Sequence, residues 1–199
     1  NKAGIAEISS NIAHIFNNQG KVSEALDYYN NSLSIYEKLN NDIGKAHCLN
    51  KIGMLYSTQG EYIEALTSHN KSLKIFQALE NKKGAAECYS NIATILHKYG
   101  DPNCKGEANC LDASQKAALD YYNKAFAIFD SLNNKKASAV VLANIGSIYN
   151  SFGDPYCELN REECLKKGQK IGIVYANRSL DIRREIKDEL GTCSILINL

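Results

Sequence analysis

The chain has 199 residues, of which 44% are apolar and 23% are charged, and its formal net charge is +1. This near-neutral balance gives no electrostatic basis for binding nucleic acid or an anionic membrane surface. No apolar run approaches the roughly 20 residues that a membrane helix needs, and no secretory signal is present. With two prolines in all, the composition suits long helices. Both ends fall inside repeated sequence, so we expect the chain to be part of a larger protein.

An eleven-residue segment recurs along the chain and sets its period. It reads SNIAHIFNNQG at 10–20, NKIGMLYSTQG at 50–60, SNIATILHKYG at 90–100 and ANIGSIYNSFG at 143–153, with a truncated copy at 197–199. The closing glycines of the four full copies are 40, 40 and 53 residues apart. A fixed period in this range is typical of stacked supersecondary units.

The segment 42–81 shows the repeating unit most clearly. Its first half carries apolar or small side chains at the spacing of one helical face: Leu49, Ile52, Gly53 and Tyr56. Its second half does the same: Ala65, Leu66, His69, Ser72, Leu73, Phe76 and Leu79. Gly60 is predicted to end the first helix and Asn81 the second, because both residues tolerate a left-handed backbone. Each unit is therefore predicted to be a helix, a short turn and an antiparallel helix.

The recurrent pattern is N-I/L-A/G-x-x-[YFL]-x-x-x-G-x-[YV]-x-E-A-L, as in 11–26 and 51–66. It resembles the tetratricopeptide repeat family over nearly the whole chain. The period of 40 exceeds the family's usual 34 and is similar to the long variety found in kinesin light chains, Gα-binding polarity adaptors and bacterial sensor proteins. The chain departs from the family pattern in two ways: Lys51 replaces the recurrent Asn of the second unit, and the usual closing Pro is missing.

The resemblance implies an all-α fold: an α-solenoid of antiparallel helix pairs forming a right-handed superhelix, with about four and a half repeats. We expect one domain over 1–199. Its repeats are predicted at approximately 2–41, 42–81, 82–134 with an insertion at 101–115, 135–188 with an insertion at 154–168, and a partial repeat at 189–199.

The two insertions resemble each other, and each is predicted to enlarge the turn inside a repeat. Each opens with Gly-Asp-Pro and carries two cysteines, and we expect the two loops to lie side by side. We favour two local disulfides, Cys104–Cys110 and Cys157–Cys164, each worth roughly 2 kcal/mol. They would imply an oxidising compartment. A zinc site across both loops and free thiols in a cytosolic protein remain open alternatives.

The other three cysteines, Cys48, Cys88 and Cys193, fall at helix positions where neighbouring repeats carry apolar residues. We predict that they are small buried side chains. His69 takes the position of Tyr29 and Tyr122, so a structural role in the core is predicted for it as well.

The resemblance also implies a concave groove, lined by the first helices, that binds an extended peptide or a helix. It places a recurrent Asn at Asn11, Asn91, Asn144 and Asn198, where an amide can pair with a ligand's backbone. The same Asn can instead be repeat consensus that holds a neighbouring turn. The predicted peptide-binding residues are Asn11, His14, Asn50, Asn91, Thr94, Asn144 and Ser147. This surface lacks the Lys and Arg set with which some relatives grip a C-terminal carboxylate.

No phosphate-binding, dinucleotide-binding or metalloprotease motif is present, so we predict no enzyme activity, no cofactor and no metal site. The predicted function is a protein- or peptide-binding scaffold without nucleic-acid binding or direct membrane contact. The chain would be the sensor or interaction region of a larger bacterial signalling protein, such as a histidine kinase or nucleotide cyclase. The alternatives are a structural spacer or dimerisation module, or a cytosolic adaptor. Loop disulfides would place it in an extracytoplasmic or periplasmic location, and free or zinc-bound thiols in the cytoplasm.

Overall fold

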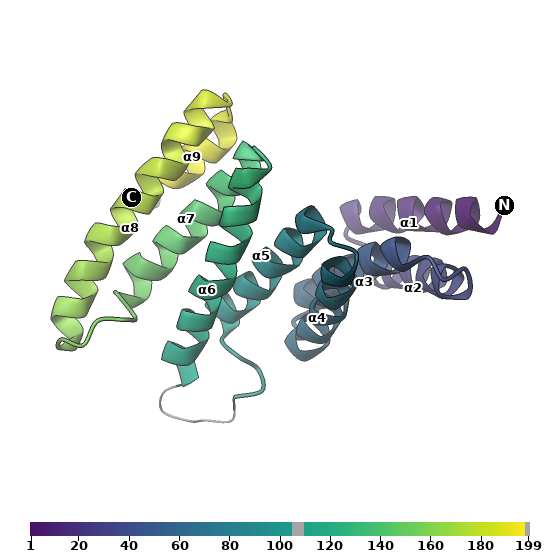
Figure 1. The fold of residues 1–199 in the computed structure, drawn as a ribbon, viewed down its shortest axis with the longest axis horizontal. Coiled ribbons are helices and arrows are strands. Elements are labelled where there is room, and N and C mark those ends of the chain that lie inside the picture. Colours follow the sequence, from purple (N-terminus) through teal and green to yellow (C-terminus); the bar gives the residue numbers. More distant parts are fainter. Residues whose placement is uncertain (105–109, 198–199) are drawn as a thin grey trace. The chain divides into compact units, whose positions relative to one another are not determined.

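The computed structural model describes residues 1–104 and 110–197, with side chains as far as Cys193. Within these residues the chain forms nine α-helices and no strand (Figure 1). The helices are α1 (Lys2–Asn18), α2 (Val22–Lys38), α3 (Asp42–Gln59), α4 (Tyr62–Ala78), α5 (Lys82–Tyr99), α6 (Cys110–Ser131), α7 (Lys135–Phe152), α8 (Arg161–Glu185) and α9 (Glu189–Ile197). The predicted all-α fold class is confirmed.

The contacts divide the chain into two compact units, Asn1–Ile92 and Ala93–Leu199, with the boundary inside α5. In the first unit α1 packs against α2, α2 against α3 and α3 against α4. In the second unit α6 packs against α7, α7 against α8 and α8 against α9. Packing between neighbours in sequence is the arrangement of a helical solenoid. The predicted single domain and its repeat boundaries stay predictions.

The helix ends follow the turn chemistry of the sequence with one correction. Gly60 ends α3 in the left-handed conformation, at φ 83°, as predicted. The same prediction for Asn81 is wrong, because Glu80 adopts positive φ (52°). Asn81 instead caps α5, and its side-chain oxygen accepts a hydrogen bond from Gly84 N at 2.8 Å. The first turn of a helix has backbone N–H groups without partners, and an Asn side chain at this position satisfies one of them.

The insertions do more than enlarge turns. The second helices α2 and α4 each have 17 residues, whereas α6 has 22 and α8 has 25. Helices α6 and α8 begin at Cys110 and Arg161, inside the predicted insertions. The C-terminal part of each insertion is therefore extra helix, and the prediction that the insertions only lengthen the turns is corrected.

Buried serines tie each of three second helices to the first helix of the same pair. Ser32, Ser72 and Ser179 each donate a hydrogen bond of 2.6–2.7 Å to a backbone carbonyl oxygen. The acceptors are the carbonyl oxygens of Ala6, Ala46 and Ala139. An unpaired hydroxyl in this position would carry a desolvation cost, so the hydrogen bond is what makes a buried serine favourable there.

Two of the three isolated cysteines pack beside these serines. Cys48 and Cys88 are buried, and their thiols donate to the hydroxyls of Ser32 and Ser72 at 3.3 Å. Burial raises the pKa of the Cys88 thiol to about 11, so this sulfur is held in its unreactive protonated form. The prediction of a buried side chain is confirmed for both. It is wrong for Cys193, which is exposed. Cys193 lies on α9, which packs against α8.

Candidate functional site

A polar side chain of each second helix α2, α4 and α6 occupies the same position in its repeat: Tyr29, His69 and Tyr122. At the second of these junctions, His69 is 1% exposed and its Nδ1 lies 2.8 Å from Oδ1 of Asn50 on α3. Asn91, on α5, donates to the same oxygen at 3.1 Å. Because Asn50 Oδ1 is an acceptor towards both neighbours, Nδ1 of His69 carries the hydrogen. Burial lowers the pKa of His69 to about 4, which favours the neutral form of the imidazole.

The third junction, in the second unit, also joins a buried polar side chain to polar groups of two neighbouring helices, with different residues and contacts. Tyr122 is fully buried, and its hydroxyl lies 2.9 Å from Oγ1 of Thr94 on α5. The side chain of Asn144, on α7, is also hydrogen-bonded to this hydroxyl. Burial raises the pKa of Tyr122 to about 12, although both hydrogen bonds act in the opposite direction. The recurrent Asn at 144 therefore contacts the polar core residue directly, whereas at 91 it bonds to Asn50, the partner of His69.

These junctions account for four of the predicted peptide-binding residues. Asn50 is 3% exposed, and its oxygen is already engaged, which counts against direct ligand contact through its side chain. Asn91, Thr94 and Asn144 are half-buried and also bonded within the junctions. Through these contacts Asn91 is joined to α3 and Asn144 is joined to α6. A role of these residues in ligand contact stays a prediction.

The first junction differs from the other two. Here the position of Thr94 is taken by His14 on α1, and the position of Asn91 and Asn144 is taken by Lys51 on α3. Within the described chain Tyr29 makes no side-chain hydrogen bond and Lys51 makes neither a hydrogen bond nor an ion pair. A small pocket opens here instead, lined by His14, Asn17, Tyr29, Lys51, Met54 and Leu55. We call it the first-junction pocket.

The first-junction pocket has a buried floor and an exposed rim. Tyr29 is 4% exposed and Leu55 is 2% exposed, whereas His14, Lys51 and Met54 are exposed. Burial raises the pKa of the Tyr29 hydroxyl, and the nearby Cys48 adds to the shift, so this phenol stays protonated and available as a donor. His14 was predicted from the sequence, but Tyr29 and Lys51 were not assigned a role. The signal for them was the replacement of the recurrent Asn by Lys51.

Two further predicted site residues lie on exposed surface. Asn11 is exposed on α1 and Ser147 is exposed on α7. Because they belong to different units, the structure does not place them relative to each other. Asn198, the last of the recurrent Asn positions, lies outside the described residues.

The four loop cysteines have the predicted pairing. Cys104–Cys110 and Cys157–Cys164 are disulfide-bonded, with Cα atoms 6.1 and 5.5 Å apart. In the parts of the chain that can be described, no group of three or more His, Cys, Asp or Glu side chains lies together as metal ligands would. The zinc alternative therefore has no support in this structure.

Both disulfide loops begin with the same turn. The side-chain carboxylates of Asp101 and Asp154 accept from the backbone N–H two residues further on, at 2.9 and 3.0 Å. The backbone carbonyls of these aspartates accept from Cys104 N and Cys157 N. Asp residues commonly organise turns in this way. The likeness of the two inserted sequences thus extends to their backbone structure.

The second disulfide loop also contacts the body of its unit. The Tyr156 hydroxyl donates to Asp120 on α6 at 3.1 Å, and the Lys116 ammonium lies 5.7 Å from the centre of the Tyr156 ring. Asp154 is buried and paired with Lys167 at 2.6 Å. Burial alone would raise the pKa of this carboxyl, but the hydrogen bonds from Lys167 and from Tyr156 N lower it. The prediction that the two loops lie against each other stays untested.

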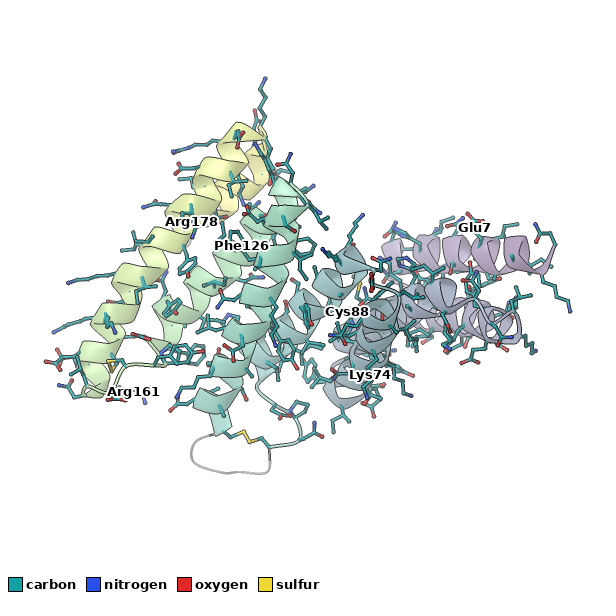
Figure 2. The ribbon with its side chains drawn as sticks, in the orientation of Figure 1. Glu7, Lys74, Cys88, Phe126, Arg161 and Arg178 are labelled. Carbon is teal, nitrogen blue, oxygen red and sulfur yellow. A yellow bond between two sulfur atoms is a disulfide. The ribbon has the colours of Figure 1, made fainter. Side chains whose placement is uncertain are left out.

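A cation in the second unit shows the contrast with Lys51. Figure 2 shows Arg178 on α8 beside Phe126 on α6, and the guanidinium carbon lies 5.4 Å from the Phe126 ring centre. It lies 5.9 Å from the ring of Tyr175, which itself stacks on Tyr149. Arg178 is thus engaged by aromatic faces within the protein. Lys51 has no such internal partner in the described residues.

Comparisons with known proteins agree with this architecture. The sequence profile of a family described as Tetratricopeptide repeat matches residues 4–78 and 49–103. No curated protein matches the chain. Among 51 matching chains of solved structures is the crystal structure of BtubC (BKLC) from P. vanneervenii, with a TM-score of 0.71 and 17% identity. The match covers 94% of this chain and 66% of that chain, so this chain spans just under two thirds of its length. A likeness at this identity shows the fold alone.

Among the residues that the structure describes, no helix is both long enough and apolar enough to cross a membrane.

Proposed function

The chain belongs to the tetratricopeptide repeat family, and we propose that it binds a protein or peptide partner on the surface that α1 and α3 share. Repeats of this family generally mediate protein–protein interaction. The proposal adds a specific binding surface to this general property of the family. It assigns the binding surface to the predicted groove of first helices.

The observation that carries this proposal is the first-junction pocket. It is lined from α1 by His14 and Asn17, and from α3 by Lys51 and Met54. Hydrogen-bonding side chains beside an exposed thioether can contact both the polar backbone and an apolar side chain of a peptide. The equivalent positions at the other two junctions are closed by internal hydrogen bonds. Binding capacity therefore concentrates at α1 and α3.

A peptide selection tests this function. The oxidised chain is immobilised and used to select binders from a displayed random dodecapeptide library, and the affinities of the selected peptides are measured in solution. The double variant His14→Ala, Met54→Ala should lose at least tenfold in affinity. The control Lys74→Ala changes an exposed residue of α4 away from the pocket and should bind as the unaltered chain does. Equal losses in both variants, or no loss in either, would contradict the proposed surface.

A more specific form of the proposal concerns the parent protein and its location. The two disulfides support an oxidising compartment, since structural disulfides persist there and are rare in the cytosol. The chain would then be an extracytoplasmic sensor region of a larger signalling protein, such as a histidine kinase or a nucleotide cyclase. Mass spectrometry after alkylation without reductant, on the protein from its native cells, tests the location. Free thiols at all four loop cysteines would contradict it.

A second candidate function is self-association or spacing, and one observation favours it. α1 exposes Ile5, Ile8 and Ile15 at 54%, 60% and 56%. The positions equivalent to Ile8 in the later repeats are Cys48, Cys88 and Val141, which are all buried. In the later repeats the preceding helix pair covers this position, so the exposed face of α1 fits a packed helix, either from a second copy of this chain or from sequence that precedes it. Sedimentation velocity decides between the functions: a dimer abolished by Ile8→Glu, together with failure of the peptide selection, would support the spacer.

A further inference from the structure

We infer that the first-junction pocket binds the carboxylate of an Asp or Glu side chain in a bound peptide, with Lys51 as its counter-ion. This inference rests on the proposed function and adds the chemical class of the ligand. In the first junction the ligand carboxylate would accept the hydrogen bonds that protein side chains accept or share in the other two junctions.

The three junctions differ in the partners of their buried polar side chain. His69 pairs with Asn50, whose oxygen also accepts from Asn91, whereas Thr94 and Asn144 both contact the Tyr122 hydroxyl. Each buried polar group thus has at least one amide or hydroxyl partner. Buried polar groups without a partner are costly, and native proteins seldom leave them so. Tyr29 has no hydrogen-bond partner in the described chain, but its hydroxyl is not among the fully enclosed unpaired atoms, so it is open to water or to a ligand atom in the first-junction pocket.

The first junction also differs from the other two in its charge. Asn stands at the recurrent position in three repeats, at Asn11, Asn91 and Asn144, but the second repeat has Lys51. A neutral amide can both donate and accept, and so it can close the junction internally. An ammonium only donates, so even if Lys51 donated to the Tyr29 oxygen, the phenol O–H and the remaining ammonium N–H groups would still need an acceptor. Both favour a ligand atom that accepts hydrogen bonds and carries negative charge.

The size and lining of the pocket select the anion. The pocket is small, and Met54 and Leu55 form its apolar part. These side chains suit the methylene groups of a Glu or Asp side chain. Lys51 is the one Lys or Arg among the lining residues. A single cation balances a carboxylate, whereas phosphate groups in proteins are usually held by several donors or by the planar fork of Arg.

Two matched probes test this inference directly. The folded, oxidised chain is titrated with N-acetyl-glutamate amide and with N-acetyl-glutamine amide, and amide chemical shifts are followed at Lys51, Tyr29 and His14. We expect the Glu probe to bind at least tenfold more tightly than the Gln probe, with shifts centred on these residues. Lys51→Asn should abolish this preference, because it restores the residue found in the other repeats. The control Lys74→Ala should retain it.

Equal binding of the two probes, or a preference unchanged in Lys51→Asn, would overturn the inference. Inorganic phosphate is titrated in parallel. Tighter saturation of the same residues by phosphate than by the Glu probe would assign the pocket to phosphate instead and would also overturn the inference.

The peptide selection separates this inference from the proposed function. Peptides that bind at α1 and α3 but show no excess of Asp and Glu would overturn the carboxylate assignment and leave the function standing. An Asp and Glu excess that disappears when the selection is repeated on Lys51→Asn would support both. If no peptide is selected and the titrations produce no chemical-shift changes, both the carboxylate assignment and the proposed function are overturned.

Discussion

Nδ1 of His69 lies 2.8 Å from Oδ1 of Asn50, and both side chains are almost completely buried. This pair, with Asn91 completing it, links α3, α4 and α5 through polar groups inside an otherwise apolar core. A buried polar network stabilises a structure only when all its members are satisfied. Each junction uses a different set of side chains, so the junctions are not interchangeable between repeats.

Asn50→Ala should destabilise the protein by about 1–3 kcal/mol, because it leaves the buried Nδ1–H of His69 and the amide of Asn91 without their shared acceptor. Urea unfolding followed by circular dichroism measures the change in the free energy of unfolding. The matched control is Asn11→Ala, at an exposed position of α1, which should change stability by less than about 0.5 kcal/mol. Equal effects of the two substitutions would contradict the junction.

Acid should destabilise the protein through His69. Its pKa is lowered from 6.5 to about 4 by burial, so between these pH values the unfolded chain binds more protons than the folded one. The contribution of His69 is fully present above pH 6.5 and is lost as the pH falls towards 4. A shift of this size corresponds to about 3 kcal/mol. The free energy of unfolding measured from pH 7 to pH 4 should decrease by an amount of this order from this residue alone.

The variant His69→Gln isolates this effect. It keeps a polar side chain but cannot titrate, so it should be less stable at pH 7 and show a shallower fall in stability between pH 6.5 and 4. An unchanged pH dependence in the variant would mean that other groups produce the acid sensitivity.

Gly53→Ala should cost about 1–3 kcal/mol, although Ala has the higher helix propensity. A Cβ at Gly53 would lie 2.8 Å from the His69 ring, too close for an ordinary contact. Ala occupies the equivalent position in α1 and α5, at Ala13 and Ala93. The control is Gly20→Ala, where a Cβ would meet nothing within 4 Å but would sit at positive φ. Thermal unfolding of both variants, and of Gly53→Ala combined with His69→Ala, measures the effect. The double variant should regain part of the stability that Gly53→Ala loses, because it removes the ring that the new Cβ would meet.

Replacing Cys157 and Cys164 by Ser should destabilise the protein by about 2 kcal/mol, because the disulfide closes a short loop and restricts the unfolded chain. The loss should be local. Hydrogen exchange should accelerate in the loop before α8 and in the first turns of α8, and should stay unchanged in α1–α4. Accelerated exchange throughout both units would contradict a local role.

Much of the fold follows from the sequence because its signals are local and repeated. The turn at Gly60 and the buried positions of Cys48 and Cys88 follow from helical spacing and from one residue's backbone freedom. The exposure of Cys193 does not, because burial depends on whether another helix covers that face. The shift of the left-handed cap from Asn81 to Glu80 shows two local preferences in competition, and helix capping by Asn81 prevails.

The candidate site was less predictable than the fold. The sequence places His14 and the recurrent Asn correctly on the first helices, but it does not show which side chains already have partners. Asn50 looks like a surface residue until the buried His69 is found beside it. From the sequence, Tyr29 is expected to be an ordinary core residue. Only the structure shows that it lacks the hydrogen-bond partners that the equivalent Tyr122 has. Such differences arise from contacts between helices, which residue spacing alone does not determine.

The most direct test of the central claim maps where a selected peptide binds. Amide and methyl chemical shifts of the oxidised chain are recorded with and without a peptide from the dodecapeptide selection. We predict that the largest changes fall on the first-junction pocket, at His14, Tyr29, Lys51 and Met54. Changes confined to the outer face of α1, at Ile5 and Ile8, or to the disulfide loops, with the pocket unaffected, would contradict the account.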